Sequence, residues 1–145
     1  MGDYRGQGFA VRLPDGATDL STYAFVLPST TDFKPSLVIK HEVRDLQTDL
    51  RQYMIDQRSL LRKQVDEFEV IREVVAEPDK PFPRVETDFE WKGSGAPRVR
   101  QRQVFIHARK RRTIYTLTAT DTAANFPNSE LMFTRIIDSF VPSDV

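Results

Sequence analysis

The segment Arg98–Ile106, RVRQRQVFI, decides how the fold of this chain is predicted. In an extended strand the side chains alternate between two faces. One face would carry Arg98, Arg100, Arg102, Val104 and Ile106, and the other Val99, Gln101, Gln103, Phe105 and His107. Glutamines in line with phenylalanine indicate one of two things. Either they are solvated near a sheet edge, or the sheet offers amides to an apolar ligand that also needs hydrogen bonds.

The preceding strand explains the arginines of this segment. Glu86, Asp88 and Glu90 alternate in the same way as the arginines, and a glycine-rich turn at residues 92–97 separates the two stretches. Pairing of opposite charges across a hairpin is therefore the favoured interpretation. The alternative is a nucleic-acid or polyanion site, because residues 98–112 hold seven Arg and Lys and no acid. Under the favoured interpretation the bend at Arg109–Arg112 only keeps the hairpin tip solvated.

The rest of the chain alternates between strand and helix patterns. Further strands are expected at 9–13, 21–27, 36–43, 68–76 and 84–91, with a return strand after Arg112. In the strands at 21–27 and 36–43 the bulky residues would face a helix-covered core and the small ones an outer face. A period of 3.6 begins at Asp45, the expected cap, and places Leu46, Leu50, Tyr53, Met54, Leu60, Leu61, Val65 and Phe68 on one stripe. A short helix is expected at about 129–140. The chain is thus predicted to be α+β, with an antiparallel sheet of about six or seven strands packed on one long helix and a C-terminal helix.

Composition excludes several classes of function. The 145 residues are expected to form one domain, 1–145, with no net charge and no cysteine. The opening residues lack the apolar core of a signal peptide, so a cytoplasmic location is expected. His41 and His107 are the two histidines, and neither has a serine or carboxylate at a spacing typical of a triad or metal site. We therefore expect no enzyme activity, no catalytic residues, no metal and no cofactor.

Several short motifs, in order along nearly the whole chain, resemble one family. They are the Leu13-Pro14-Asp15 turn, Asp19-Leu20-Ser21, PSLVIKHE, DLRQYMIDQ, RQVFI and YTLTAT. Together they resemble the DcrB-related domain, and most closely the Eag (effector-associated gene) chaperones of bacterial type VI secretion. The resemblance implies a PsbP-like fold and a cytosolic homodimer. Such a protein binds the N-terminal transmembrane helices of a PAAR-containing effector before export.

The resemblance also implies a binding surface on the outer face of the sheet. By position, that surface comprises Thr22, Ala24, Val26, Ser36, Val38, Lys40, Gln57, Leu61, Val65 and Gln103. Gln57 interrupts the apolar stripe of the helix. It either lies partly exposed at the margin of the stripe or, if buried, needs a hydrogen-bond partner, because a buried amide without one costs about 1–3 kcal/mol. Thr22, Ala24 and Lys40 depart from the aliphatic or small polar residues that the family has there. The alternative within the same family is a generic DcrB-like interaction domain without helix clients.

Overall fold

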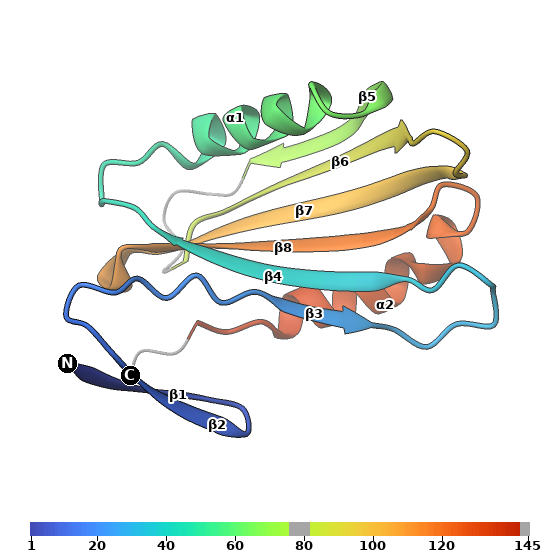
Figure 1. Cartoon of the computed structure of the whole chain (residues 1–145). Coiled ribbons are helices and arrows are strands. Elements are labelled where there is room, and N and C mark those ends of the chain that lie inside the picture. Colours follow the sequence, from blue (N-terminus) through green and yellow to red (C-terminus); the bar gives the residue numbers. More distant parts are fainter. Residues whose placement is uncertain (76–81, 143–145) are drawn as a thin grey trace.

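The computed structural model describes residues 1–75 and 82–142, which form an α+β fold (Figure 1). A six-stranded antiparallel sheet has the order β3-β4-β8-β7-β6-β5, and β1 and β2 form a separate two-stranded sheet. The elements are β1 (Gly2–Gly6), β2 (Phe9–Leu13), β3 (Tyr23–Val26), β4 (Ser36–Val43), α1 (Leu50–Arg62), β5 (Asp66–Val75), β6 (Arg84–Lys92), β7 (Arg98–Ala108), a 3-10 turn (Arg109–Arg111), β8 (Thr113–Thr122) and α2 (Phe126–Ser139). The expected strand end at Ala76 lies outside the described residues.

The hairpin of β6 and β7 confirms the predicted pairing of charges for Asp88 and Glu90 but not for Glu86, which lies opposite Val104 and pairs with Arg72 and Arg84 instead. Asp88 lies opposite Arg102, and Glu90 lies opposite Arg100. Arg102 donates to both carboxylate oxygens of Asp88, at 2.8 and 2.9 Å, and Arg100 donates to Asp88 at 2.8 Å. Arg98 pairs diagonally with Glu90 at 2.9 Å. The arginines of the RVRQRQVFI segment therefore form ion pairs with carboxylates of the neighbouring strand.

The two helices cover opposite faces of the large sheet. On one face, Val104, Ile106 and Leu117 pack with Phe133 and Ile137 of α2. On the other face, Phe105, Val85 and Ile114 pack with Tyr53 and Met54 of α1. The outer face predicted for the small residues is therefore not free of helices, because α1 covers part of it. The bulky residues Leu37 and Ile39 do face a helix-covered core, but the helix that covers them is α2.

Helix α1 is shorter than the apolar period predicts. It begins at Leu50, and Asp49 rather than Asp45 caps it by accepting a hydrogen bond from the Gln52 N–H. The Asp45 side chain instead accepts from the Gln47 N–H in the preceding turn. Leu46 remains 50% exposed, and Phe68 belongs to β5, where its ring stacks on Phe89. The apolar spacing of α1 continues past its end because Phe68 of the next strand, β5, also points toward the core under α1.

The N-terminal strands also differ from the prediction. A strand before Phe9 was not expected, yet β1 pairs with β2 through a turn in which Gly8 has a φ of 78°. This hairpin lies outside the large sheet and is joined to the following segment by a hydrogen bond of 3.0 Å between Tyr4 and Ser21 (Figure 1). The strand expected at 21–27 is limited to Tyr23–Val26. Neither helix in the described part of the chain has the length and apolar character needed to cross a bilayer.

Candidate binding groove beside helix α1

A groove of about 870 Å³ lies between α1 and the sheet, and we call it the α1 groove. It exists because α1 packs mainly on β5, β6 and β7 and, apart from contacts near Ile114 and Glu42, leaves β3, β4 and β8 uncovered on the same face. Its lining residues are Leu20, Thr22, Ser36, Val38, Lys40, His41, Glu42, Tyr53, Gln57, Leu60, Leu61, Gln64, Gln101, Gln103, Phe105, Thr116, Thr118 and Thr120. The groove thus joins one side of α1 to the open half of the sheet.

Cross-strand register gives the floor of the groove its chemistry. One row of neighbours runs through Ala24, Val38, Thr118 and Gln103. The next row runs through Val26, Ser36, Thr120 and Gln101. Small aliphatic side chains on β3 and β4 are therefore continuous with hydroxyls on β8 and amides on β7. These two rows have mostly small side chains, carry no charge and can form hydrogen bonds.

The two floor glutamines differ in how completely they are paired. Gln101 accepts from the Trp91 indole and donates to the Thr120 hydroxyl, at 2.8 and 2.9 Å. Gln103 donates to the Thr118 hydroxyl at 3.3 Å, but its Oε1 is buried and has no hydrogen-bond partner within residues 1–75 and 82–142. A buried acceptor left in this state costs about 1–3 kcal/mol.

Gln57 contributes an amide from the opposite wall. It is half-buried on α1, and its side chain makes no hydrogen bond to the described residues. This agrees with the expected alternative of a partly exposed residue at the margin of the apolar stripe. The Gln57 amide on the helix wall and the Gln103 Oε1 on the floor are therefore both available to a ligand.

One end of the groove carries charged side chains. Lys40 is exposed there, and Glu42 is held by Arg44 at 2.8 Å and by a hydrogen bond from the Tyr53 hydroxyl. Burial, together with this hydrogen bond to Glu42, raises the pKa of Tyr53 above its ordinary value, so the phenol stays protonated.

The structure brings most of the predicted surface together. Seven of the predicted residues line the groove, namely Thr22, Ser36, Val38, Lys40, Gln57, Leu61 and Gln103. Ala24 and Val26 lie just beyond it, on the same face of β3 as their partners Val38 and Ser36. Val65 is half-buried after the end of α1 and lies outside the groove.

Sequence reasoning missed the central hydroxyl row. Thr116, Thr118 and Thr120 alternate with Leu117 and Ala119 along β8, and the two apolar residues are buried under α2. The TLTAT alternation was the available signal. Its apolar half indicated a strand, and its threonines then had to face the opposite side.

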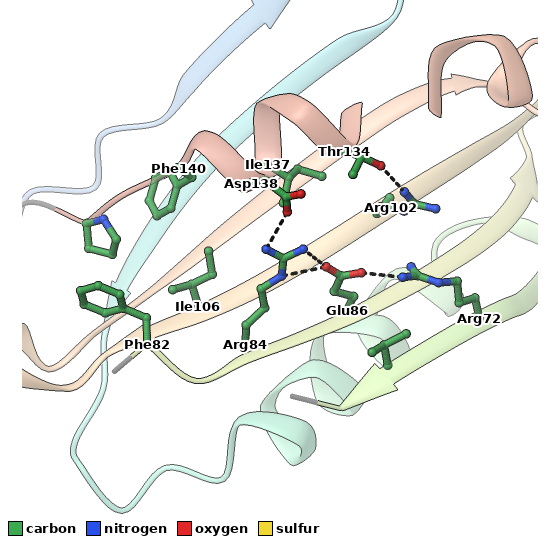
Figure 2. Close-up of a pocket in the computed structure, with 12 residues that line it drawn as sticks. Arg72, Phe82, Arg84, Glu86, Arg102, Ile106, Thr134, Ile137, Asp138 and Phe140 are labelled. Atoms are coloured by element: carbon green, nitrogen blue, oxygen red, sulfur yellow. Dashed lines mark hydrogen bonds and ion pairs between the residues drawn. The ribbon is translucent and has the colours of Figure 1, made fainter. Parts of the chain in front are cut away.

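A second cavity, of about 570 Å³, lies beside α2 on the other face (Figure 2). Arg84 bridges Glu86 on its own strand and Asp138 of α2, and Arg72 of β5 donates to Glu86 at 2.7 Å. Arg102 also reaches the Thr134 hydroxyl at 3.4 Å. Figure 2 thus shows a chain of ion pairs from Arg72 through Glu86 and Arg84 to Asp138 along this cavity, which leaves it less suited to an apolar partner than the α1 groove.

The carboxylates beneath α2 have lowered pKa values. Burial alone raises the pKa of Asp88, but hydrogen bonds from Arg102 and Arg100 outweigh burial and bring it below its usual range. Burial likewise raises the pKa of Glu86, and hydrogen bonds from Arg72 and Arg84 lower it overall. Both groups therefore remain ionised at neutral pH. Arg72 connects them to the edge strand β5, and Arg84 and Arg102 connect them to acids of α2.

A family model and a solved structure match nearly the whole of this chain. The DcrB family model matches residues 10–139, and the chain therefore belongs to the DcrB family. A search of curated protein sequences finds no match. Among solved structures, the Pseudomonas aeruginosa protein PA94 is similar, with a TM-score of 0.78 and 24% identity over 100% of this chain and 99% of PA94. PA94 is described as a protein of unknown function with a suggested role as a regulator, and the likeness is one of fold.

Proposed function

We propose that this protein is a chaperone whose α1 groove binds an apolar helix of a client protein. The observation that carries the proposal is the combination of an open, uncharged floor with unpaired amide groups. Gln103 has a buried acceptor without a partner, and Gln57 faces the same groove from α1. An apolar helix that contains a few polar side chains satisfies both needs, because it covers aliphatic area and supplies hydrogen-bond donors.

The dimensions of the floor support a single helix. Three uncovered strands, spaced about 4.8 Å apart, give a floor roughly 14 Å wide. An α-helix with its side chains is about 10–12 Å across. The eight residues of β4 extend for about 26 Å. A membrane-spanning helix of about 20 residues is roughly 30 Å long, so the floor supports most of one such helix.

Small side chains on the floor favour close approach. Ser36 and Thr118 on the floor, with Ala24 just beyond it on the same face, let a helix backbone come near the sheet, as small residues do between helices in membranes. Covered apolar area contributes about 25 cal/mol per Å². The hydroxyls and amides supply partners for polar groups that would otherwise be buried unpaired.

The proposed client is a secreted effector of the PAAR type, whose N-terminal transmembrane segments need cover before type VI secretion. This finer proposal rests on the resemblance to Eag chaperones. It includes a cytoplasmic location, a homodimer and binding rather than catalysis. A second copy would supply a second groove, as a client with more than one apolar segment requires.

Co-expression with a PAAR-type effector that has N-terminal apolar segments tests this function. The effector is produced intact or without its N-terminal apolar segments, and co-purification is measured in low and high salt. We expect capture that depends on those segments and persists in high salt. A polyanion site would instead lose binding steeply as salt rises.

Matched variants locate the binding surface. Val38→Asp places a charge on the groove floor and should weaken capture at least about tenfold, because binding would bury that charge. Val43→Asp is its control on the same strand, since Val43 is 67% exposed and lies outside the groove. Gln103→Ala should weaken capture roughly 2- to 13-fold, the range expected for one hydrogen bond. Capture that is insensitive to both groove variants would refute the proposal.

A further inference from the structure

The α1 groove has two ends that differ in charge. Lys40, Thr116, Phe105 and Val85 form the row of neighbours at one end, and Trp91 lies toward the other. Val85 and Trp91 are six positions apart on β6, a distance of about 20 Å in a strand. The Trp91 indole donates to Gln101, which lines the groove, so this single tryptophan marks the second end.

Lys40 supplies uncompensated positive charge at the first end. It is exposed, lines the groove and has no carboxylate partner among residues 1–75 and 82–142. Its cross-strand neighbour is the uncharged Thr116. The nearest acid on β4, Glu42, is already paired with Arg44 and accepts a hydrogen bond from Tyr53.

The direction of α1 places its N-terminus at this end of the groove, where the Asp49 carboxylate that caps the helix offsets its partial positive charge, so Lys40 supplies the positive charge there. Tyr53, in the first turn of α1, bonds to Glu42, whereas Gln64 follows the last turn and lines the groove farther along. The N-terminus of α1, which carries a partial positive charge, therefore lies at the Lys40 end. The basic turn between β7 and β8 lies there too, because the Arg44 N–H donates to the Arg112 carbonyl at 2.7 Å.

Two acids near this end, Asp45 and Asp49, keep their charge but are held outside the groove by local hydrogen bonds. Asp49 caps α1 by accepting from the Gln52 N–H, and Asp45 accepts from the Gln47 N–H and the Thr48 hydroxyl. Neither lines the groove. The groove itself consequently presents positive charge at one end and uncharged amides and hydroxyls toward the other.

We propose that Lys40 fixes the direction in which a client helix lies in the groove. The C-terminal end of the client helix, with its partial negative charge and any acidic residue that follows it, lies at Lys40. The client then runs antiparallel to α1. This inference rests on the proposed function and adds client polarity to it. Helix-end charge interactions at exposed sites correspond to roughly 2- to 5-fold in affinity.

Synthetic peptides test the direction. Each has an apolar helix of about 14 residues, two lysines at its N-terminus, two aspartates at its C-terminus, and a nitroxide at one end or the other. The nitroxide quenches Trp91 only when it lies near that end of the groove. We expect quenching by the N-terminal label and little by the C-terminal label. Lys40→Ser should weaken peptide binding 2- to 5-fold and reduce this difference, whereas Lys63→Ser, an equal charge loss at the other end of α1, should change neither.

The outcomes separate the two proposals. Peptide binding with equal quenching by both labels, or with a preference that Lys40→Ser leaves intact, overturns the role of Lys40 and leaves the chaperone function standing. Failure of every peptide to bind overturns both. A preference that Lys40→Glu reverses, with the N-terminal lysines now drawn to that end, supports the inference directly.

Discussion

Replacing Asp88 by alanine should destabilise the fold more than any other single change of charge on the sheet. The Asp88 side chain is fully buried and accepts hydrogen bonds from three arginines. Arg102, its bidentate partner, is only 8% exposed, and its guanidinium also lies over the Phe126 ring at 5.5 Å. Without Asp88, the buried positive charge of Arg102 keeps only Glu130 as an ionic partner within the described residues.

The magnitude follows from that loss of compensation. Removing one partner of a buried ion pair costs about 3–5 kcal/mol, because the remaining charge is left desolvated. For an m-value of about 2 kcal/mol per molar in urea, this lowers the unfolding midpoint by roughly 2 M. It is a large fraction of the 5–15 kcal/mol that stabilises a typical domain.

Urea unfolding followed by the fluorescence of Trp91 measures the effect, with Glu90→Gln as the control. Glu90 pairs with Arg98, which is 30% exposed, so its loss should cost no more than about 1 kcal/mol. A loss below about 1 kcal/mol for Asp88→Ala would refute the reasoning. It would mean that water or neighbouring acids compensate Arg102 once Asp88 is gone.

Three further predictions follow from the same structure. The folded-state pKa values of Asp88 and Glu86 are lowered, so the stability that these carboxylates contribute is present above their unfolded-state pKa values of about 4 and is lost as pH falls through their folded-state values. The urea midpoint should therefore fall between pH 7 and pH 2, and it should fall less in Asp88→Asn. Burial first, and the charge of Arg109 second, lower the pKa of His107, whose Nε2 is buried and unpaired within the described residues. The free energy of unfolding should therefore decline as pH falls below the unfolded-state pKa of about 6.5. The variant His107→Phe should remove this part of the pH dependence. In urea unfolding, Met54→Ala should cost about 2–5 kcal/mol, because Met54 is fully buried. Leu46→Ala should change the free energy of unfolding by less than about 0.5 kcal/mol, because Leu46 is half exposed. Equal costs for the two variants would contradict the observed start of α1.

Much of the candidate groove could be predicted because strands alternate strictly. Once β3, β4 and β7 were assigned, Val38 had to share a face with Ser36, and Gln103 with Phe105. The family resemblance then selected which face binds. The hydroxyl row on β8 was missed because its threonines carry no distinctive pattern by themselves. Only pairing with β4 and β7 brings Thr118 between Val38 and Gln103.

The errors in the prediction have physical causes. The apolar period ran from Leu46 to Phe68 because core-facing residues before, within and after α1 happen to keep similar spacing. Local hydrogen bonding decided the helix start, since Asp49 rather than Asp45 caps the first turn. The strand Gly2–Gly6 contains two glycines and no aliphatic residue, so nothing in its composition indicated a strand.

Sequence alone determined the class of fold, most of the strands and the charge pairing of β6 with β7. These depend on local alternation, turn residues and complementary charges that neighbouring segments carry. Only the tertiary structure decided that α1 and α2 cover opposite faces and that each leaves part of its face open. That choice depends on which strands each helix packs against, which is a property of the assembled sheet. The groove, its unpaired glutamines and its charged end all follow from it.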